Sequence, residues 1–362
     1  MTSPDLRCHA PYMQWAKGRP AARYDLAISN VLGCTIDDLP GAAEALSLSG
    51  RNDNGYPPLL EAIAARYGVQ PSQVATAQGA SGANLLVYAA LLEPGDDVLV
   101  ERPGYDPLLG AARLPGASVV RFDRAFAEGY RLDPDAVRKA MTPRTKLIVL
   151  TSPHNPSGVL ADGSALDAVG ELAAAQGAHV LVDEVYLDTI EAPPPAACRS
   201  DVFISTSSLT KSYGLAGLRC GWILSSPALA DRFRRARDVV DGTGSIVAER
   251  LAVLAFAHLD RLAARARAIL AENAPKVQAF VRGRPELDWV EPQAGTVGFP
   301  RLRPAADTTR FAERLLAERG TAIVPGRFFD APQHFRLGFS GVPDAIDPGL
   351  REIAAALDAR AW

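Results

Sequence analysis

The sequence predicts an α/β protein with a large domain, built on a doubly wound, mostly parallel sheet, and a smaller α+β domain. Between residues 74 and 224, short β-rich runs alternate with helical segments, and several of these runs are almost continuously apolar. Continuous apolar runs are typical of parallel strands that have helices on both faces. The chain has 362 residues, more than one hydrophobic core usually accommodates, and this length favours two domains.

Seven β-rich runs predict a seven-stranded sheet, with strands at 74–77, 97–102, 118–122, 146–151, 179–184, 202–208 and 220–225. Helical patterns lie between them, such as 83–92 and 165–177, the second of which ends at Gly177. Strands and helices that alternate in this way are the pattern of a doubly wound fold.

Beyond Pro227 the pattern changes, and stretches rich in Ala, Arg and Leu predict helices over 227–282. An α+β unit is expected to follow, with strands within 287–292, 295–300, 321–326 and 334–340 and helices near 307–319 and 344–360. The first 40 residues are expected to be irregular and to pack on this unit. The predicted domains are therefore 42–245 for the large one, and 1–41 with 246–362 for the small one.

Composition and charge exclude several kinds of partner. The formal net charge is -3, and the chain has no dense block of Lys and Arg, so neither nucleic acid nor an anionic membrane is indicated. No apolar run approaches the length of a membrane span, and the first residues form no apolar signal segment. We therefore expect a cytoplasmic location.

The cysteines and histidines show no metal-binding spacing. Cys8, Cys34, Cys198 and Cys220 are scattered without a CxxC pair, which argues against both a disulfide framework and a zinc site. The five histidines form no HExxH or facial-triad pattern. No metal site is predicted.

Ligands of open parallel sheets bind beyond the C-terminal ends of the strands, so unusual residues at those ends are the candidates for a site. The run "QGASGANLL" follows the first strand, where Gly79 frees the backbone and a helix is expected to begin near 81–83. Backbone N–H groups at a helix start bind phosphate, although the same run also fits a plain strand–helix turn.

Two further strand ends present an aromatic ring and an amide. The run "ERPGYDP" presents Tyr105, which either stacks on a flat ligand or packs in the interior. The run "TSPHNPSG" presents Asn155 between two prolines. Its amide either donates to a ligand oxygen or belongs to an ordinary Asn-Pro turn.

The run "VLVDEVY" ends with Asp183, Glu184 and Tyr186. These acids fit a metal site, an acid–base pair or a partner for a cation, and Asp183 also fits a helix N-cap. The chain supplies no further metal ligands nearby, whereas one aspartate that faces a cationic ring nitrogen forms a strong charge-assisted hydrogen bond.

The run "TSSLTKSYGLAGLRCGW" holds Lys211 and Arg219 among small residues and glycines. Burial opposes the charge of a lysine and makes its neutral amine a nucleophile toward carbonyls, while a surface position is the ordinary alternative. Arg219 offers a bidentate fork for a phosphate.

Together these clusters fit one ligand, a flat phosphorylated aldehyde with a cationic ring nitrogen and a phenolic oxygen, which is pyridoxal phosphate. Lys211 would meet the aldehyde and Asp183 the ring nitrogen. Asn155 and Tyr186 would meet the phenolic oxygen. The phosphate would meet Ala80, Ser81, Ser208 and Arg219.

The chain resembles the class I and II aminotransferases, which are fold-type I pyridoxal-phosphate enzymes. The runs "SPHNPSG", "DEVY" and "SLTKSYGLAGLRCGW" occur in that family's order, and the resemblance extends from about residue 20 to residue 355. It implies a Schiff base on Lys211, a ring nitrogen that Asp183 keeps protonated, and Tyr105 as the ring-stacking aromatic. Lys211, Asp183 and Tyr186 are thus the expected catalytic residues.

The resemblance also implies a substrate site. Arg336, in "HFRLGFS", matches the family's arginine for the substrate α-carboxylate, while a surface arginine on an edge strand is the alternative. Asn155 and the backbone around Ile28 and Ser29 are expected to contribute.

Two departures from the family pattern concern the partner subunit and the substrate. The family's tyrosine that reaches the partner's phosphate falls near Gly50, whereas the tyrosine present here is Tyr56. No counterpart of the second arginine that selects dicarboxylic substrates is found, which disfavours an enzyme specific for Asp or Glu. A homodimer with shared active sites is implied by the resemblance.

The leading hypothesis is an aminotransferase that moves an amino group between an L-amino acid and a 2-oxo acid. A lyase or synthase that eliminates, replaces or cyclises remains open, because the same residues serve those reactions. Ser208 and Lys211 also match the SxxK pattern of penicillin-binding-type acyl-enzymes, without the partner motifs. A non-catalytic ligand sensor is a third alternative, although no DNA-binding module or basic face accompanies it.

Overall fold

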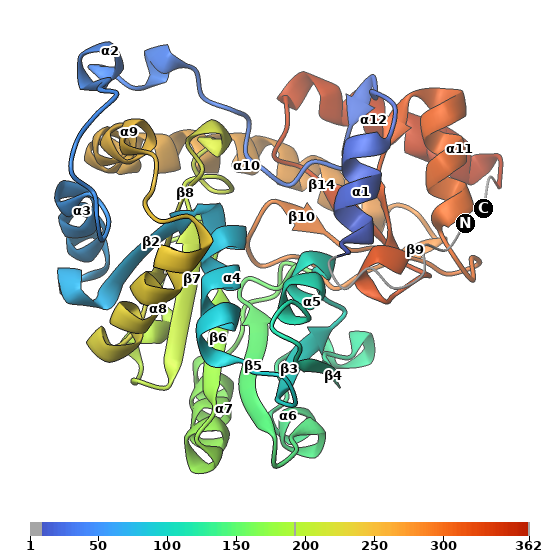
Figure 1. Ribbon diagram of the computed structural model, residues 1–362. Coiled ribbons are helices and arrows are strands. Elements are labelled where there is room, and N and C mark those ends of the chain that lie inside the picture. Colours follow the sequence, from blue (N-terminus) through green and yellow to red (C-terminus); the bar gives the residue numbers. More distant parts are fainter. Residues whose placement is uncertain (1–8, 192, 361–362) are drawn as a thin grey trace.

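The computed structural model describes residues 9–191 and 193–360, and its centre is a seven-stranded sheet (Figure 1). The strand order is β2-β8-β7-β6-β5-β3-β4. β8 runs antiparallel to β2 and β7, and the other pairs are parallel, so the predicted doubly wound, mostly parallel sheet is confirmed. The strands are β2 (Val74–Gln78), β3 (Asp97–Arg102), β4 (Ser118–Asp123), β5 (Thr145–Thr151), β6 (His179–Asp183), β7 (Phe203–Ser208) and β8 (Cys220–Leu224).

Helices cover both faces of the sheet, because successive side chains of a strand point to opposite faces. Val98 and Val100 of β3 pack in one apolar cluster with α4, α5 and α8, whereas Leu99 packs in another with α6 and α7. α3 and α9 extend the second layer over β2 and β8. These helices are α3 (Pro57–Tyr67), α4 (Gly79–Leu91), α5 (Asp106–Ala112), α6 (Pro134–Ala140), α7 (Gly163–Gln176), α8 (Pro227–Val240) and α9 (Ile246–Ala257).

The C-terminal part forms the smaller α+β unit. Its three-stranded antiparallel sheet has β14 in the middle, between β10 and β13. Two short strand pairs flank it, β9 with β11 and β1 with β12. The elements are α10 (Leu259–Arg282), α11 (Thr309–Arg319), α12 (Pro343–Asp358), β9 (Leu287–Asp288), β10 (Val297–Gly298), β11 (Arg301–Leu302), β12 (Thr321–Ala322), β13 (Val324–Pro325) and β14 (Phe335–Gly338).

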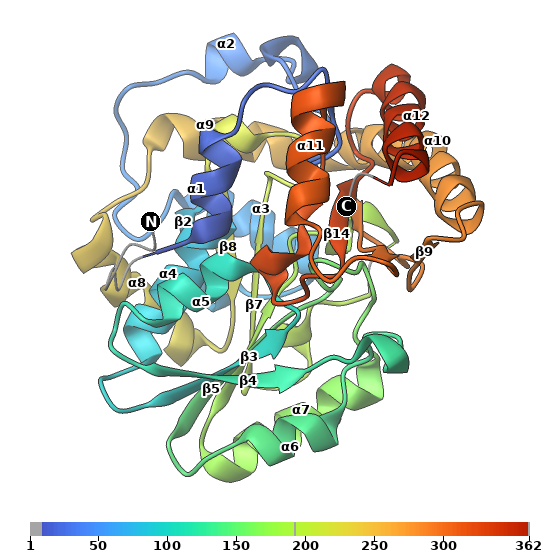
Figure 2. The same ribbon diagram turned by 90° about the vertical axis from the view of Figure 1, so that its right-hand side faces the viewer.

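The N-terminal segment packs on this unit through β1 (Tyr24–Asp25), which pairs with β12, and through α1 (Pro11–Gly18), which lies beside α11 (Figure 2). The prediction of an irregular segment is wrong for α1. The ring centroids of Tyr12 and Trp15 lie 6.0 and 5.4 Å from that of Phe328. These aromatic contacts come from far along the chain, so the local sequence did not reveal the helix.

The packing of α9 bears on the domain boundary expected at residue 246. α9 contacts α3 and α2 (Ala42–Ala45) beside the large sheet, and α10 then runs on to contact α12. This packing favours a boundary within α10, and the domain limits stay a prediction. Within the described ranges, no helix is both long and apolar enough to cross a membrane.

Candidate active site

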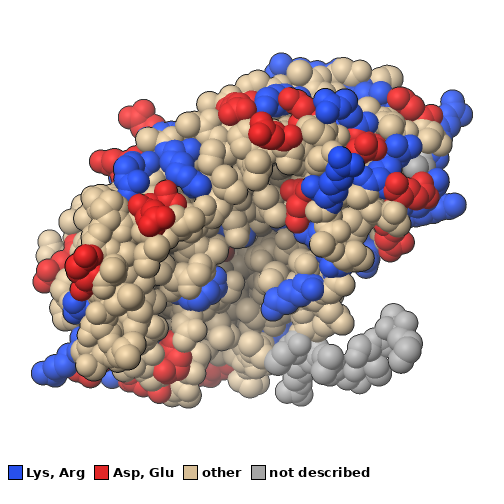
Figure 3. Space-filling view, turned by 90° about the horizontal axis from the view of Figure 1, so that it is seen from above, with Lys and Arg blue, Asp and Glu red and all other residues tan. Residues whose placement is uncertain are grey.

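A pocket of about 410 Å³ opens at the C-terminal edge of the large sheet, and all nine predicted cofactor-binding residues line it. Seen from above, the surface of the molecule is hollowed, and the hollow shows few charged side chains (Figure 3). The sequence prediction thus identified groups that the fold brings together. The nine residues are Ala80, Ser81, Tyr105, Asn155, Asp183, Tyr186, Ser208, Lys211 and Arg219.

The start of α4 forms one flank of the pocket. α4 begins at Gly79, two residues earlier than expected, and Gly79 has a φ of +69°. The guanidinium of Arg219 packs directly on this turn, and a Cβ added at Gly79 would collide with Arg219 Nη2. Backbone N–H groups at the helix start and the guanidinium therefore face the same space, beside Ala80, Ser81 and Ser208, which suits a phosphate.

Asp183 lies at the end of β6 and is only 6% exposed. Asn84 Nδ2 donates to Asp183 Oδ2 at 2.8 Å, and Asn84 Oδ1 accepts from Thr206 Oγ1 at 2.6 Å. Burial raises the pKa of Asp183, while the Asn84 hydrogen bond and Lys211 oppose that rise. The site thus offers an oriented, buried carboxylate that a cationic ring nitrogen would stabilise.

Asn84 was missed by the sequence analysis, although it also lines the pocket. Its signal was an amide within the apolar helical run "ANLLVYAALL". A buried amide needs hydrogen-bond partners, and Asp183 and Thr206 supply them.

Lys211 lies in the pocket and is partly buried, so the alternative of a surface lysine is wrong. Its Nζ donates to Asn30 Oδ1 at 2.7 Å and to Ser29 Oγ at 3.0 Å. Burial lowers the pKa of Lys211 to about 8. Asn30 was missed by the sequence analysis, whereas Ser29 was expected near the substrate.

Arg336 lies in β14, the middle strand of its sheet, and is 1% exposed, so the alternative of a surface arginine is wrong. Arg336 Nη1 donates to Asn155 Oδ1 at 3.2 Å, and Nη2 donates to the hydroxyl of Tyr12 at 2.7 Å. Among the described residues, Nε of Arg336 has no partner. One donor of Arg336 therefore remains unpaired within the described chain, although Arg336 itself is not among the residues that line the pocket. Tyr12 belongs to α1 and was not predicted.

The phenol rings of Tyr186 and Tyr105 lie on other walls of the pocket. The Tyr186 hydroxyl is buried, and no described residue hydrogen-bonds to it. A buried hydroxyl without a partner suits a ligand oxygen. Tyr105 precedes α5, and its hydroxyl donates to Met13 Sδ at 3.5 Å.

Glu184 does not join Asp183 in the pocket. Its Oε1 accepts from Ala196 N at 2.9 Å, and burial raises the pKa of Glu184 to about 8. The described chain brings no three His, Cys, Asp or Glu side chains together in a way that suits a metal ion. Asp183 Oδ1 accepts from Val185 N at 3.3 Å within a local turn. Asp183 is not the N-cap of the short helix that follows, because Tyr186 occupies that position.

Three of the four cysteines lie in the described residues, where Cys34, Cys198 and Cys220 are free thiols. Cys8 lies outside those residues. Tyr56 does not line this pocket; its backbone N–H donates to Glu249 Oε2 at 3.1 Å, and its ring lies beside Arg250. Whether Tyr56 replaces the family tyrosine near Gly50 stays a prediction.

The sequence matches the family described as "Aminotransferase class I and II" over residues 25–353. The chain belongs to the class I and II aminotransferases. Its fold is fold type I, its cofactor is pyridoxal 5′-phosphate, and its activity is that of an aminotransferase, as the sequence analysis predicted. The pocket has groups that suit the phosphate, the ring nitrogen and the aldehyde of that cofactor, namely Arg219, Asp183 and Lys211.

Three relatives span nearly the whole chain. Capreomycidine synthase of Streptomyces vinaceus is 33% identical over 97% of this chain and 94% of its own. A PLP-dependent aminotransferase from Streptococcus suis 89-1591 is 28% identical, with a TM-score of 0.91 over 99% of both chains. The PLP-dependent cyclase OrfR is also 28% identical, with a TM-score of 0.88 over 99% of this chain and 100% of that one.

The acyl-enzyme alternative conflicts with this family and with the local contacts. The Nζ of Lys211 donates to Ser29 and Asn30, whereas Ser208 Oγ accepts from the backbone N–H of Thr210 at 3.3 Å. Within the described residues, no hydrogen bond joins Ser208 to Lys211. The SxxK match is therefore incidental.

Proposed function

We propose that this aminotransferase takes the amino group from an L-amino acid with a single carboxylate and gives it to a 2-oxo acid. Bound pyridoxal phosphate supplies an aldehyde that condenses with amines and a ring that withdraws electrons. Lys211 would hold the cofactor through its amine and would then move the proton at the substrate α-carbon. The partly buried amine of Lys211, with its lowered pKa, carries this proposal.

The proposed contacts of the cofactor follow from the two flanks of the pocket. The start of α4, Ser208 and Arg219 would hold the phosphate. Asp183, oriented by Asn84, would keep the ring nitrogen protonated. Asn155 and the unpartnered hydroxyl of Tyr186 would bind the phenolic oxygen. Tyr105 would stack on the ring.

The proposed substrate class follows from the cations that line the pocket and from Arg336, which lies behind Asn155. Arg336, held by Asn155 and Tyr12, would grip the α-carboxylate with help from Ser29. Lys211 and Arg219 are the Lys and Arg side chains on the described lining, and both have roles toward the cofactor. This subunit therefore presents no further cation for a second carboxylate. Much of the remaining wall is apolar, formed by Met13, Leu85, Leu108, Ala111 and Leu114.

The first test is the visible absorption of the purified protein with added pyridoxal phosphate, beside Lys211→Ala. The wild type is expected to show the yellow band of a lysine-bound cofactor, and the variant only the spectrum of free cofactor. A panel of amino acids then follows, in which monocarboxylic donors bleach the band faster than Asp or Glu. Equal spectra of the two proteins contradict the role of Lys211, and fastest bleaching by Asp or Glu contradicts the substrate class.

A second candidate is a cyclising or replacing synthase on the same cofactor. Its support is the resemblance to capreomycidine synthase over 97% of the chain and to the cyclase OrfR. Amino transfer produces a 2-oxo acid and pyridoxamine phosphate in equal amounts. A synthase instead regenerates the original cofactor spectrum and yields a cyclic or substituted amino acid, so product mass and cofactor spectrum separate the two.

The proposal also includes a homodimer, which the resemblance to this family implies, and a cytoplasmic location, which the sequence analysis predicts. Sedimentation velocity tests the dimer, and a monomer that retains full activity contradicts shared active sites. Fractionation of the source cells tests the location.

A further inference from the structure

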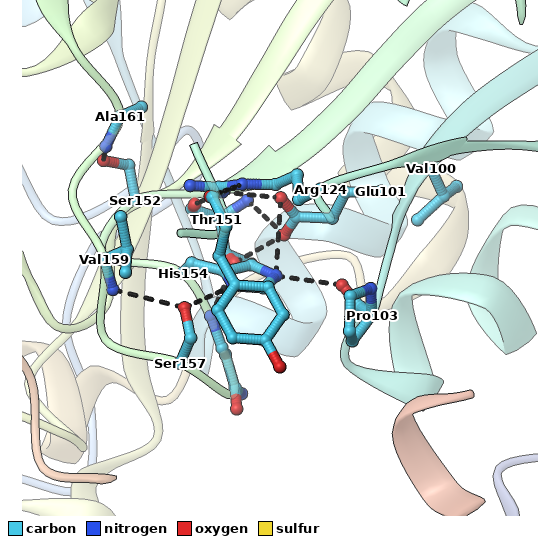
Figure 4. Close-up of polar contacts among 12 residues, drawn as sticks. Val100, Glu101, Pro103, Arg124, Thr151, Ser152, His154, Ser157, Val159 and Ala161 are labelled. Atoms are coloured by element: carbon cyan, nitrogen blue, oxygen red, sulfur yellow. Dashed lines mark hydrogen bonds and ion pairs between the residues drawn. The ribbon is translucent and has the colours of Figure 1, made fainter. Parts of the chain in front are cut away.

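The loops that carry Tyr105 and Asn155 meet at a closed cluster of polar side chains (Figure 4). Of this cluster only Thr151 reaches the pocket lining, and the other members lie behind it. The loops leave the adjacent parallel strands β3 and β5. The cluster is fully buried or nearly so, with exposures between 0% and 3%. We call it the strand-end network, and it consists of Glu101, Arg124, Thr151, His154 and Ser157.

An ion pair forms the base of the strand-end network. Arg124 Nη1 donates to Glu101 Oε2 at 2.9 Å, and Arg124 Nε donates to the carbonyl of Tyr130 at 2.8 Å. A buried ion pair loses hydration and often stabilises a fold no better than apolar residues do. A gain in stability therefore explains this ion pair poorly. Its hydrogen bonds to neighbouring residues, which fix their positions, are more informative about its role.

Thr151 transmits the position of Glu101 to Asn155. Glu101 Oε1 accepts from both the backbone N–H and the hydroxyl of Thr151, at 2.7 and 2.5 Å. Because the hydroxyl donates to Glu101, its oxygen is free to accept, and Asn155 N donates to it at 2.8 Å. The side chain of Asn155 then accepts from Arg336. Thr151 thus links the buried carboxylate to the proposed ligand of the phenolic oxygen.

His154 links the same loop to the loop of Tyr105. Its Nε2 lies 2.9 Å from the carbonyl of Pro103, which only accepts, so Nε2 carries the proton. Nδ1 must then accept from the hydroxyl of Ser157, at 2.6 Å. Burial, and next the charge of Arg124, keep the pKa of His154 well below its usual range, so the ring stays neutral. Both ring nitrogens are therefore fixed.

We propose that Thr151, anchored by the buried Glu101–Arg124 pair, is a positioning residue that sets the place of the Asn155 amide at the cofactor's phenolic oxygen. His154, through the carbonyl of Pro103, holds the Tyr105 loop in a fixed position relative to the Asn155 loop. This inference rests on the proposed role of Asn155. It assigns Thr151, whose hydroxyl is taken up by Glu101 and Asn155, an indirect role: it determines how firmly the Asn155 amide favours the ionised form of that oxygen.

A pair of threonines on β5 gives a matched test. Thr145 is the first residue of β5 and Thr151 is the last, and both are buried. The Thr151 hydroxyl accepts from the backbone N–H of Asn155, and the Thr145 hydroxyl accepts from that of Thr142. Thr151→Val and Thr145→Val remove the hydroxyl at nearly constant volume. The measurements are the pH titration of the bound cofactor's visible absorption, the apparent dissociation constant of pyridoxal phosphate, and the melting temperature of the apoprotein.

Thr151→Val is expected to raise the titration midpoint by about 0.5–1 pH unit and to weaken cofactor binding about fivefold, the scale of one lost hydrogen bond. Thr145→Val is expected to leave both at the wild-type values while it lowers the melting temperature comparably. Thr151→Ser, which keeps the hydroxyl, should restore the midpoint. Thr151→Ala and Thr145→Ala make the same comparison if the valine variants do not fold.

A wild-type midpoint and affinity in Thr151→Val, with only a loss of thermal stability like that of Thr145→Val, overturns the inference. Asn155→Ala separates this outcome from failure of the proposed function. If Asn155→Ala shifts the midpoint and Thr151→Val does not, only the positioning role fails. If Asn155→Ala also leaves the midpoint unchanged, the proposed role of Asn155 fails together with the inference.

Discussion

The two flanks of the active-site pocket are built in different ways. On one flank, Asp183, Asn155 and Tyr186 are at most 6% exposed. Asp183 accepts a hydrogen bond from Asn84 of α4, and Asn155 N donates one to Thr151 at the end of β5. We call this the closed flank. On the open flank, at the start of α4, the side chains of Ser81 and Arg219 are exposed. The closed flank can fix geometry, whereas the open flank supplies charge and backbone donors close to solvent.

This contrast predicts where substitutions act most strongly. A charge or hydrogen bond in a dry, preorganised site has a larger effect than the same group beside water, where solvent and salt screen it. Changes on the closed flank should therefore alter the chemical step. Changes on the open flank should alter cofactor affinity by small factors that depend on salt.

Asp183→Asn should break the closed flank most severely. The amide keeps the shape of the carboxylate but removes the negative charge that would face the ring nitrogen, so kcat should fall about 10²–10³-fold, as for one preorganised electrostatic contact. Steady-state kinetics at saturating cofactor measure the loss. Glu184→Gln is the control, because Glu184 is also buried but bonds away from the pocket. Equal losses in the two variants contradict a special role for Asp183.

Arg336→Gln should lower kcat/KM about 10²-fold, mainly through KM, because charged hydrogen bonds to a buried carboxylate are lost. The cofactor spectrum should stay close to that of the wild type, since Arg336 would bind the substrate. Arg336→Lys keeps a charge without the planar fork and should recover only part of the loss. An unchanged KM for the amino donor in Arg336→Gln argues against α-carboxylate binding.

The sequence predicted the large sheet and much of the pocket because each signal was local. Asp183 and Lys211 stand out at strand ends and in a glycine-rich loop, where one short run suffices to identify them. The resemblance to a family then assigned roles to them. Arg336 was found only through that resemblance, because a lone arginine in a strand has no local signal of burial.

The residues that were missed reach the site from distant parts of the chain. Asn30 meets Lys211 across 181 positions, and Tyr12 meets Arg336 across 324. Glu101 and Thr151 are 50 positions apart and meet only because β3 and β5 pair in the sheet. Contacts of this kind depend on how the whole chain packs, so no pattern within a window of the sequence specifies them.

Lys211 lies between the flanks, and its titration sharpens the comparison. Burial lowers its pKa from 10.5 to about 8, so the rate of cofactor attachment to the apoprotein should fall about tenfold per pH unit below pH 8 and level off above it. The unfolded chain keeps this proton up to about pH 10.5, whereas the folded chain loses it near pH 8. The free energy of unfolding of the apoprotein should therefore increase as the pH rises from 8 to 10.5. Stopped-flow absorbance gives the rate profile, and a midpoint near 10.5 contradicts a buried amine.

Arg219→Gln should have the smallest effect, because the guanidinium is exposed at the open flank. The apparent dissociation constant of pyridoxal phosphate should rise about three- to tenfold at low salt. That difference should shrink near 1 M salt, where the screening length is about 3 Å. The loss expected for Thr151→Val, in contrast, should not depend on salt, since its hydrogen bonds are buried. Arg131→Gln, which removes another exposed arginine, should leave the affinity unchanged. A salt-independent loss in Arg219→Gln shows that the open flank is dry when the cofactor is bound, and the distinction between the flanks then fails.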